Sequence, residues 1–265
     1  MKTRLLFALA LIACACTTQE RNDYRKYNVT GPVKEIILQS DSLAMPWTAE
    51  FKRSGRLNKV TIFNFDGSEY SVRTYRYNSR KQLTAIYGVV QFGEKAMDYK
   101  YKYDGDFTSE CRTFDHEGQE VYRWVFENDG QNIVRTEFYE TDTLQFYGVR
   151  DYNGEHYTSK VYNPEGELIS TTEVDFCQLE DKPTRIVSDN EDITIEYNEQ
   201  GLPVMSRGTV VNSTGDLQHR SDLATYPCRY YSYEYDERGN WITRYERKAP
   251  DSPDAIIIKR TILYY

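Results

Sequence analysis

Aromatic and charged residues alternate along much of the chain in short runs. In Tyr75-Arg76-Tyr77, Tyr101-Lys102-Tyr103 and Tyr233-Glu234-Tyr235, two rings at positions i and i+2 flank a charged residue. Successive side chains of a β-strand point to opposite faces, so each run places both rings on one face and the charge on the other. Beyond the N-terminal apolar run, no stretch of twelve or more residues has the 3.6-residue period of an amphipathic helix. The pattern therefore predicts strands and almost no helix.

Turn signals separate these runs at regular intervals. Segments that begin with Asn or Asp and have Gly at their fourth position include 163–166, 198–201 and 236–239. We expect Asp236 to accept hydrogen bonds from turn amides and Gly239 to adopt a positive φ. Gly239→Val should therefore destabilise the hairpin more than Asp236→Ala does. The spacing of the turns, about twelve residues or a multiple of it, predicts an all-β antiparallel meander of hairpins.

Shorter turn signals fall between other strands. The dipeptides Asp66-Gly67, Asp104-Gly105 and Asn153-Gly154 are typical of two-residue hairpin loops. All three are predicted to join strands directly.

The best-formed repeat resembles a known sequence motif. The phrase Y-x-Y-D-x-x-G-N at 233–240 is similar to the YD or RHS-type repeat. The segment 235–248, followed by 256–265, resembles the C-terminal end of YD-repeat-like lipoproteins of Bacteroidetes. The resemblance covers about 50–245, but Lys81 stands where the motif has Gly, and 167–192 and 205–230 hold no clear unit. Large RHS proteins wind such repeats into a shell around a toxin. For this shorter chain the resemblance implies a curved or rolled, half-barrel-like sheet.

The N-terminus has the features of an export signal. Lys2 and Arg4 precede nine apolar residues, 5–13, far fewer than the ~20 that a membrane-spanning helix requires. The run ends in Leu11-Ile12-Ala13-Cys14, which resembles the lipobox of bacterial lipoproteins. Cys16 offers a second, less fitting frame, and an ordinary secretory signal is the alternative. An acylated Cys14 would attach the protein durably to a lipid bilayer.

These features divide the chain into three parts. Residues 1–13 are the predicted lipoprotein signal peptide, 14–30 an N-terminal tether, and 31–265 a single YD-repeat-like β domain. The expected location is the cell envelope, as a lipid-anchored protein of the outer membrane, with the periplasmic and surface faces both open.

The net charge limits the kinds of partner, and the cysteine count limits the number of disulfides. The chain has 33 basic and 41 acidic residues, a net charge of −8. Without Lys2 and Arg4 the basic residues fall to 31 and the net charge to −10, which argues against nucleic-acid binding. Beyond the anchor region, Cys111, Cys177 and Cys228 allow at most one disulfide among them.

Catalytic motifs are absent from the sequence. The three histidines, His116, His156 and His219, lack the spacing of a zinc site, and there is no G-x-S-x-G, P-loop or dinucleotide fingerprint. We therefore expect no enzyme activity, no cofactor and no metal. A glycan-active enzyme using an Asp/Glu pair remains a less favoured alternative, because carboxylates are abundant.

The aromatic content suggests two uses. The chain holds 24 Tyr, 11 Phe and 3 Trp, and such rings either fill a sheet interior or stack on a ligand. We expect an envelope-anchored scaffold for binding or interaction, with a carbohydrate-binding module as the alternative. A glycan or an envelope protein is the expected partner. The candidate rings for stacking on such a ligand are Trp47, Trp124 and Trp241.

Overall fold

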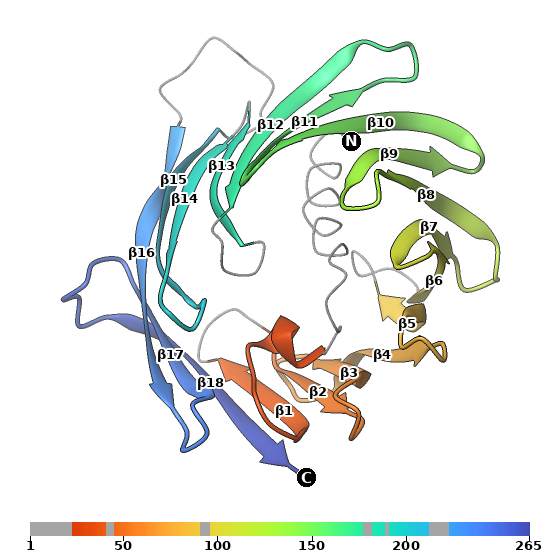
Figure 1. The fold of residues 1–265 in the computed structure, drawn as a ribbon. Helices are drawn as coiled ribbons and strands as arrows, with labels where there is room; N and C mark the ends of the chain where they lie inside the picture. The colour runs from red at the N-terminus through yellow and green to blue at the C-terminus, as the bar shows by residue number, and fades with distance from the viewer. Residues whose placement is uncertain (1–22, 41–44, 91–95, 177–181, 189–190, 212–222) are drawn as a thin grey trace. The chain divides into compact units, whose positions relative to one another are not determined.

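The computed structural model describes residues 23–40, 45–90, 96–176, 182–188, 191–211 and 223–265 (Figure 1). These ranges contain eighteen strands and one 3-10 helix, η2 (Asp23–Tyr27). Within them, no helix has the length and apolar character needed to span a membrane. The prediction of an all-β antiparallel meander is confirmed, because every strand ladder with a described register is antiparallel.

The strands follow one another with short connections. The first nine are β1 (Val33–Ser40), β2 (Trp47–Phe51), β3 (Leu57–Phe63), β4 (Glu69–Tyr77), β5 (Leu83–Val90), β6 (Ala96–Asp104), β7 (Phe107–Phe114), β8 (Glu120–Asn128) and β9 (Ile133–Glu140). The second nine are β10 (Thr143–Asn153), β11 (His156–Tyr162), β12 (Leu168–Phe176), β13 (Pro183–Ser188), β14 (Glu191–Tyr197), β15 (Pro203–Val211), β16 (Leu223–Tyr235), β17 (Trp241–Arg247) and β18 (Ala255–Tyr264).

The first and last strands of the chain pair with each other. All eighteen strands belong to one hydrogen-bonded sheet, in which β1 pairs with β2 on one side and with β18 on the other. Ile36 lies opposite Ala49 of β2 and Ile262 of β18, and the three strands run side by side in Figure 1. The expected half-barrel-like sheet is therefore wrong, because neither β1 nor β18 is a free edge of the sheet. Pairing of β1 with β18 satisfies the backbone groups that such edges would leave open.

Contacts within the chain define two compact units. In the described ranges, unit 1 comprises 103–110 and 124–229, and unit 2 comprises 23–102, 111–123 and 230–265. The single domain over 31–265 remains a prediction.

One five-residue turn recurs in seven hairpins of the described chain. In each, the N–H of the first residue donates to the C=O of the fifth, and the N–H of the fourth donates to the C=O of the first. The fourth residue always has a positive φ, and it is Gly in every case but Lys81, at 62°. The ladder shifts by one residue beside most of these turns, as a glycine-containing bulge requires. The turns are Lys52–Arg56, Asn64–Ser68, Asn78–Gln82, Asp115–Gln119, Asn163–Glu167, Asn198–Leu202 and Asp236–Asn240.

The two-residue loops were predicted correctly at two of three places. Only two residues separate β6 from β7, and Gly154 begins the two-residue link between β10 and β11. Asp66-Gly67, by contrast, belongs to the five-residue turn Asn64–Ser68, so the prediction of a tight loop there is wrong. Asn64 is the first residue of that turn, two residues earlier than the Asp-Gly pair suggests, and Oδ1 of Asp66 accepts the N–H of Ser68 at 2.9 Å.

The helix η2 packs against the apolar face of β1, β2 and β3 in unit 2. The Tyr24 and Phe51 ring centroids are 5.1 Å apart, and those of Tyr27 and Trp47 are 5.6 Å apart. Val33 and Ile36 beside them are fully buried. Part of the expected tether, from Asp23 onward, is thus packed into the core of unit 2.

Candidate functional site

A polar face of unit 1 is built by the registers of β9, β10 and β11. Arg135 and Lys160 both lie opposite Val149, one on each neighbouring strand. In the next row along the strands, Tyr147 lies opposite Tyr162. Because alternate residues of a strand share a face, these side chains all project from the same side of the sheet.

A shallow hollow of about 500 Å³ opens above Val149. Val149 is 39 % exposed and is shorter than its neighbours on all sides, so its position forms the floor of the hollow. The complete lining is Arg135, Tyr147, Val149, Asp151, Thr158, Lys160 and Tyr162.

Two stacked tyrosines border the hollow. The ring centroids of Tyr147 and Tyr162 are 5.2 Å apart with an interplanar angle of 18°. The guanidinium of Arg135 lies 4.4 Å from the centroid of the Tyr147 ring, so cation and rings form one continuous stack. This stack holds the aromatic wall in a fixed orientation.

Arg135 is itself positioned by a carboxylate. Its Nη2 lies 2.9 Å from Oε1 of Glu137, and its Nε donates to the same oxygen at 3.0 Å. The hydroxyl of Tyr139 donates to Oε2 of Glu137 at 2.7 Å. The Tyr139 hydrogen bond and, to a lesser extent, Arg135 lower the pKa of Glu137. Arg135 is therefore held against an ionised carboxylate at neutral pH.

Two charged groups of the hollow have no protein partner in the described part of the chain. The side chains of Lys160 and Asp151 take part in no hydrogen bond or ion pair there, and both line the hollow. An exposed ammonium and an exposed carboxylate beside an aromatic wall can hydrogen-bond a ligand that offers both acceptors and donors.

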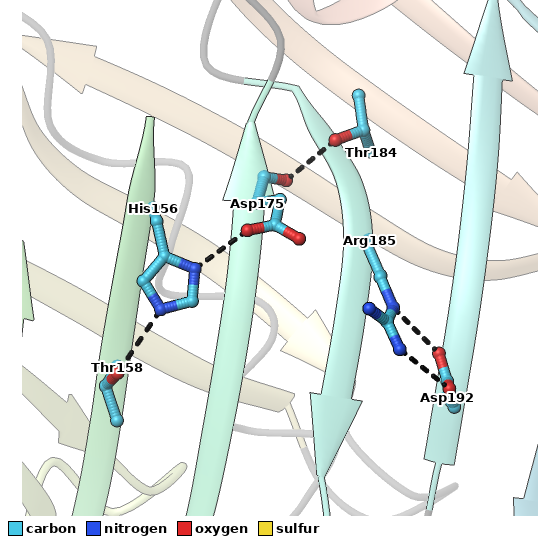
Figure 2. A network of polar contacts seen from close by, with 6 residues as sticks. All are labelled: His156, Thr158, Asp175, Thr184, Arg185 and Asp192. Carbon is cyan, nitrogen blue, oxygen red and sulfur yellow. Dashed lines mark hydrogen bonds and ion pairs between the residues drawn. The ribbon is translucent and has the colours of Figure 1, made fainter. Parts of the chain in front are cut away.

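A polar network continues the same face onto β12, β13 and β14. Figure 2 shows His156 on β11 facing Asp175 on β12, with Nδ1 and Oδ1 2.7 Å apart. The Thr158 hydroxyl lies 3.4 Å from the other ring nitrogen of His156. On the next strands, Arg185 binds Asp192 through two hydrogen bonds of 3.3 and 3.1 Å.

The contacts from Thr158 to His156 and from His156 to Asp175 follow the order hydroxyl, imidazole and carboxylate of a nucleophilic triad. The geometry of a triad is not reproduced. The Thr158 contact is long, and the side chains of His156 and Asp175 are 37 and 48 % exposed. Water therefore competes for both groups. We interpret the network as a cross-strand lock that fixes Thr158 at the border of the hollow.

None of the three tryptophans predicted to stack on a ligand lines the hollow. Trp124 and Trp241 are each only 8 % exposed, and Trp47 is half-buried beside η2. The Trp124 ring packs 4.5 Å from Phe138 and 5.7 Å from Phe146. Trp124 and Trp241 are therefore buried and present little ring surface for stacking on a ligand.

The predicted turn residues lie at the end of β16 in unit 2. Gly239 has φ 77°, and Oδ1 of Asp236 accepts from the N–H groups of Arg238 and Asn240 at 2.9 Å each. Asn240 is almost fully buried and ties the turn to Thr30 by a hydrogen bond of 2.7 Å. This hairpin therefore fastens the N-terminal segment of unit 2 as well as reversing the chain.

The remaining predictions concern cysteines and metals. Cys14, Cys16 and Cys177 lie outside the described residues. Cys111 and Cys228 form no disulfide within the described chain. Among the residues that the structure describes, no three His, Cys, Asp or Glu side chains gather as a metal site would require.

Comparison with known proteins assigns no family. No protein-family model matches the sequence, and no curated protein matches it. The resemblance to YD or RHS repeats therefore remains a prediction.

Solved structures show only weak similarity. A porin-like protein from Bacteroides uniformis is 12 % identical, with 89 % of this chain and 98 % of that chain covered and a TM-score of 0.43. A porin-like protein from Bacteroides vulgatus is 10 % identical, with 88 and 98 % covered and a TM-score of 0.36. A chain of the TcdB2-TccC3-TEV crystal structure is 11 % identical over 94 % of this chain but 15 % of its own, with a TM-score of 0.34. None of these scores supports a functional assignment.

Proposed function

We propose that the chain is a lipid-anchored protein of the outer membrane whose β structure binds a ligand in the hollow above Val149 and catalyses no reaction. The hollow carries this proposal. It joins a fixed aromatic wall to an ammonium and a carboxylate that have no protein partner in the described structure. A small number of polar groups around an apolar surface is the usual composition of a ligand site.

The anchor part of the proposal comes from the sequence. Cys14 follows Leu11-Ile12-Ala13 after a short apolar run, as the acylated cysteine of a lipoprotein does. Cys14→Ser should move the protein from the membrane fraction to the soluble fraction, whereas Cys16→Ser should not. Loss of attachment with Cys16→Ser alone would identify Cys16 as the anchor, and attachment of both variants would refute lipidation here.

The binding part is tested by filling the hollow. Val149→Phe places a ring where the floor is now open, and since Val149 is exposed, the sheet can accept it without repacking. On an array of neutral glycans, acidic glycans and peptides, the wild type should bind at least one class. Val149→Phe should weaken that binding about ten-fold or more, which is ~1.4 kcal/mol.

A matched control separates this effect from a general change of surface. Ile256 of β18 is also 39 % exposed but lies in unit 2, so Ile256→Phe should leave binding unchanged. Equal binding by the wild type and Val149→Phe, with both folded by circular dichroism, would exclude the hollow as the ligand site.

A further inference from the structure

We infer that the ligand of the hollow is an acidic saccharide, a sugar whose ring carries a carboxylate. The inference rests on the proposed binding function and specifies the chemistry of its ligand. Its two elements are a pair of cations on either side of the hollow and a carboxylate at its border that selects for hydroxyl groups.

The cations stand on both sides of the floor. Arg135 on β9 and Lys160 on β11 are both register partners of Val149 on β10. Neighbouring strands lie about 4.8 Å apart, so the two backbones are separated by roughly 10 Å, and both long side chains can reach a group above Val149. A carboxylate placed there would meet the Lys160 ammonium on one side and, on the other, the Arg135 guanidinium, which is already paired with Glu137.

Both cations have donors to offer. Lys160 has no partner in the described chain, so its three N–H groups are available. Arg135 uses Nε and Nη2 for Glu137, which leaves Nη1 for a ligand. Because Glu137 and the Tyr147 ring hold the guanidinium in place, binding would cost little side-chain entropy at Arg135.

Asp151 argues against a simple inorganic anion. Its carboxylate lines the same hollow and would repel a phosphate or sulfate that offers only acceptors. A sugar hydroxyl, however, can donate to Asp151 while a ring carboxylate binds the cations. The hydroxyls of Thr158, Tyr147 and Tyr162 can both donate and accept, as sugar recognition requires.

The aromatic wall supports the same class. The C–H groups of a sugar ring form an apolar surface that packs against tyrosine, while the hydroxyl at the tip of each tyrosine stays available for hydrogen bonds. A neutral sugar would satisfy the wall and Asp151 but would leave Lys160 without a counter-charge. The complete set of groups is matched by a uronic acid residue.

The test compares uronic acid oligomers with their own carboxyl-reduced forms. Oligomers of galacturonate, mannuronate and glucuronate keep their stereochemistry when the carboxylate is reduced to a hydroxymethyl group. Calorimetry with the full chain should show binding of at least one acidic oligomer and at least ten-fold weaker binding of its reduced form. Raising the salt concentration should weaken binding of the acidic oligomer selectively, because Lys160 is solvent-exposed.

Two lysine variants isolate the charge contribution. Lys160→Met should weaken the acidic oligomer about ten-fold and leave the reduced form unchanged. Lys259→Met, which removes an exposed lysine of β18 in unit 2, should change neither.

The outcomes distinguish the inference from the proposed function. If a reduced oligomer or a peptide binds as tightly as every acidic oligomer, and Val149→Phe abolishes that binding, the acidic-saccharide inference is overturned while the site stands. If Val149→Phe affects no ligand at all, both are refuted. Binding of an acidic oligomer that is unaffected by Lys160→Met would also overturn the inference.

Discussion

The guanidinium of Arg260 stacks on the ring of Trp241, 3.8 Å from its centroid, and donates a hydrogen bond to the Trp241 carbonyl. The same guanidinium donates to the carbonyls of Tyr27 at 2.6 Å and Asn28 at 3.0 Å. Arg260 is only 5 % exposed. One buried cation thus joins β17, β18 and the C-terminal end of η2, all within unit 2.

Replacement of Arg260 should strongly destabilise unit 2. Arg260→Met would leave three carbonyls without their donor and remove a desolvated cation–π contact, at a cost of about 3 kcal/mol or more in the free energy of unfolding. Arg238 also stacks on a ring, 3.9 Å from the centroid of Tyr264, but it is exposed. Arg238→Met should therefore cost about 1 kcal/mol or less. Urea titration measures both, and equal losses would show that burial of Arg260 adds nothing.

Acid should remove the stabilisation that Asp236 provides. Burial favours a raised pKa for Asp236, but hydrogen bonds from Tyr264 and the two turn amides, together with the charge of Arg260, outweigh it and lower the pKa. Because the folded pKa is lower than the unfolded one, the contribution is complete above about pH 4 and is lost as the pH falls through the folded value. Asp236→Asn should thus be less stable than the wild type at pH 7, on the order of 1 kcal/mol, and the difference should shrink toward pH 2.5.

The Tyr264 hydroxyl provides the control for this pH dependence. In a Tyr264→Phe background the carboxylate loses one of its hydrogen bonds, so the effect of Asp236→Asn at pH 7 should be smaller. A difference between wild type and Asp236→Asn that stays constant from pH 7 to 2.5 in thermal unfolding would contradict the assignment.

The sequence predicted what is encoded locally. Alternation of rings and charges specifies strands, and an Asx residue followed three positions later by Gly specifies the turn, as at Asp236 and Gly239. These signals act over four to eight residues, so they fix each hairpin without reference to the rest of the chain. They contain no information about β1 and β18, whose pairing joins residues more than 200 positions apart.

The candidate site was missed because it exists only across strands. Arg135, Val149 and Lys160 are separated by more than ten residues each, and only the registers of β9, β10 and β11 bring them into one row. Tryptophan has the largest ring for stacking on a ligand, but the same size favours its burial, as at Trp124 and Trp241. No local pattern distinguishes Tyr147 and Tyr162 from the tyrosines of other strands.

Lys81 occupies the glycine position of a repeated turn, and its replacement by glycine should stabilise the protein. Its φ of 62° lies in the left-handed region, where a side-chain-bearing residue is strained by about 1–2 kcal/mol. Lys81→Gly removes this strain but adds about 0.5–1 kcal/mol of unfolded-state entropy. We expect a net stabilisation of roughly 0.5–1 kcal/mol, measured as a higher urea midpoint. Lys81→Ala retains the Cβ and should bring no such gain, and a gain equal to that of glycine would point to lost charge as the cause.

A comparison of Gly88 with Gly239 separates two costs of adding a Cβ atom, the strain of a positive φ and the steric clash with neighbouring atoms. Their φ angles are 76° and 77°, but a Cβ added at Gly88 would lie 2.3 Å from the carbonyl oxygen of Val72, whereas nothing lies within 4 Å of one added at Gly239. Gly88 sits in β5 where the ladder with β6 shifts register, and its N–H donates to Asp98 at 3.0 Å, so the backbone there is held from both sides. Gly239→Ala should cost about 1 kcal/mol, for conformation alone. Gly88→Ala should cost about 1–3 kcal/mol more, because an atom must be fitted against fixed backbone. Urea unfolding measures both losses. If Gly88→Ala and Gly239→Ala lower the free energy of unfolding equally, the backbone of β4 moves away from the new Cβ in β5 at no cost.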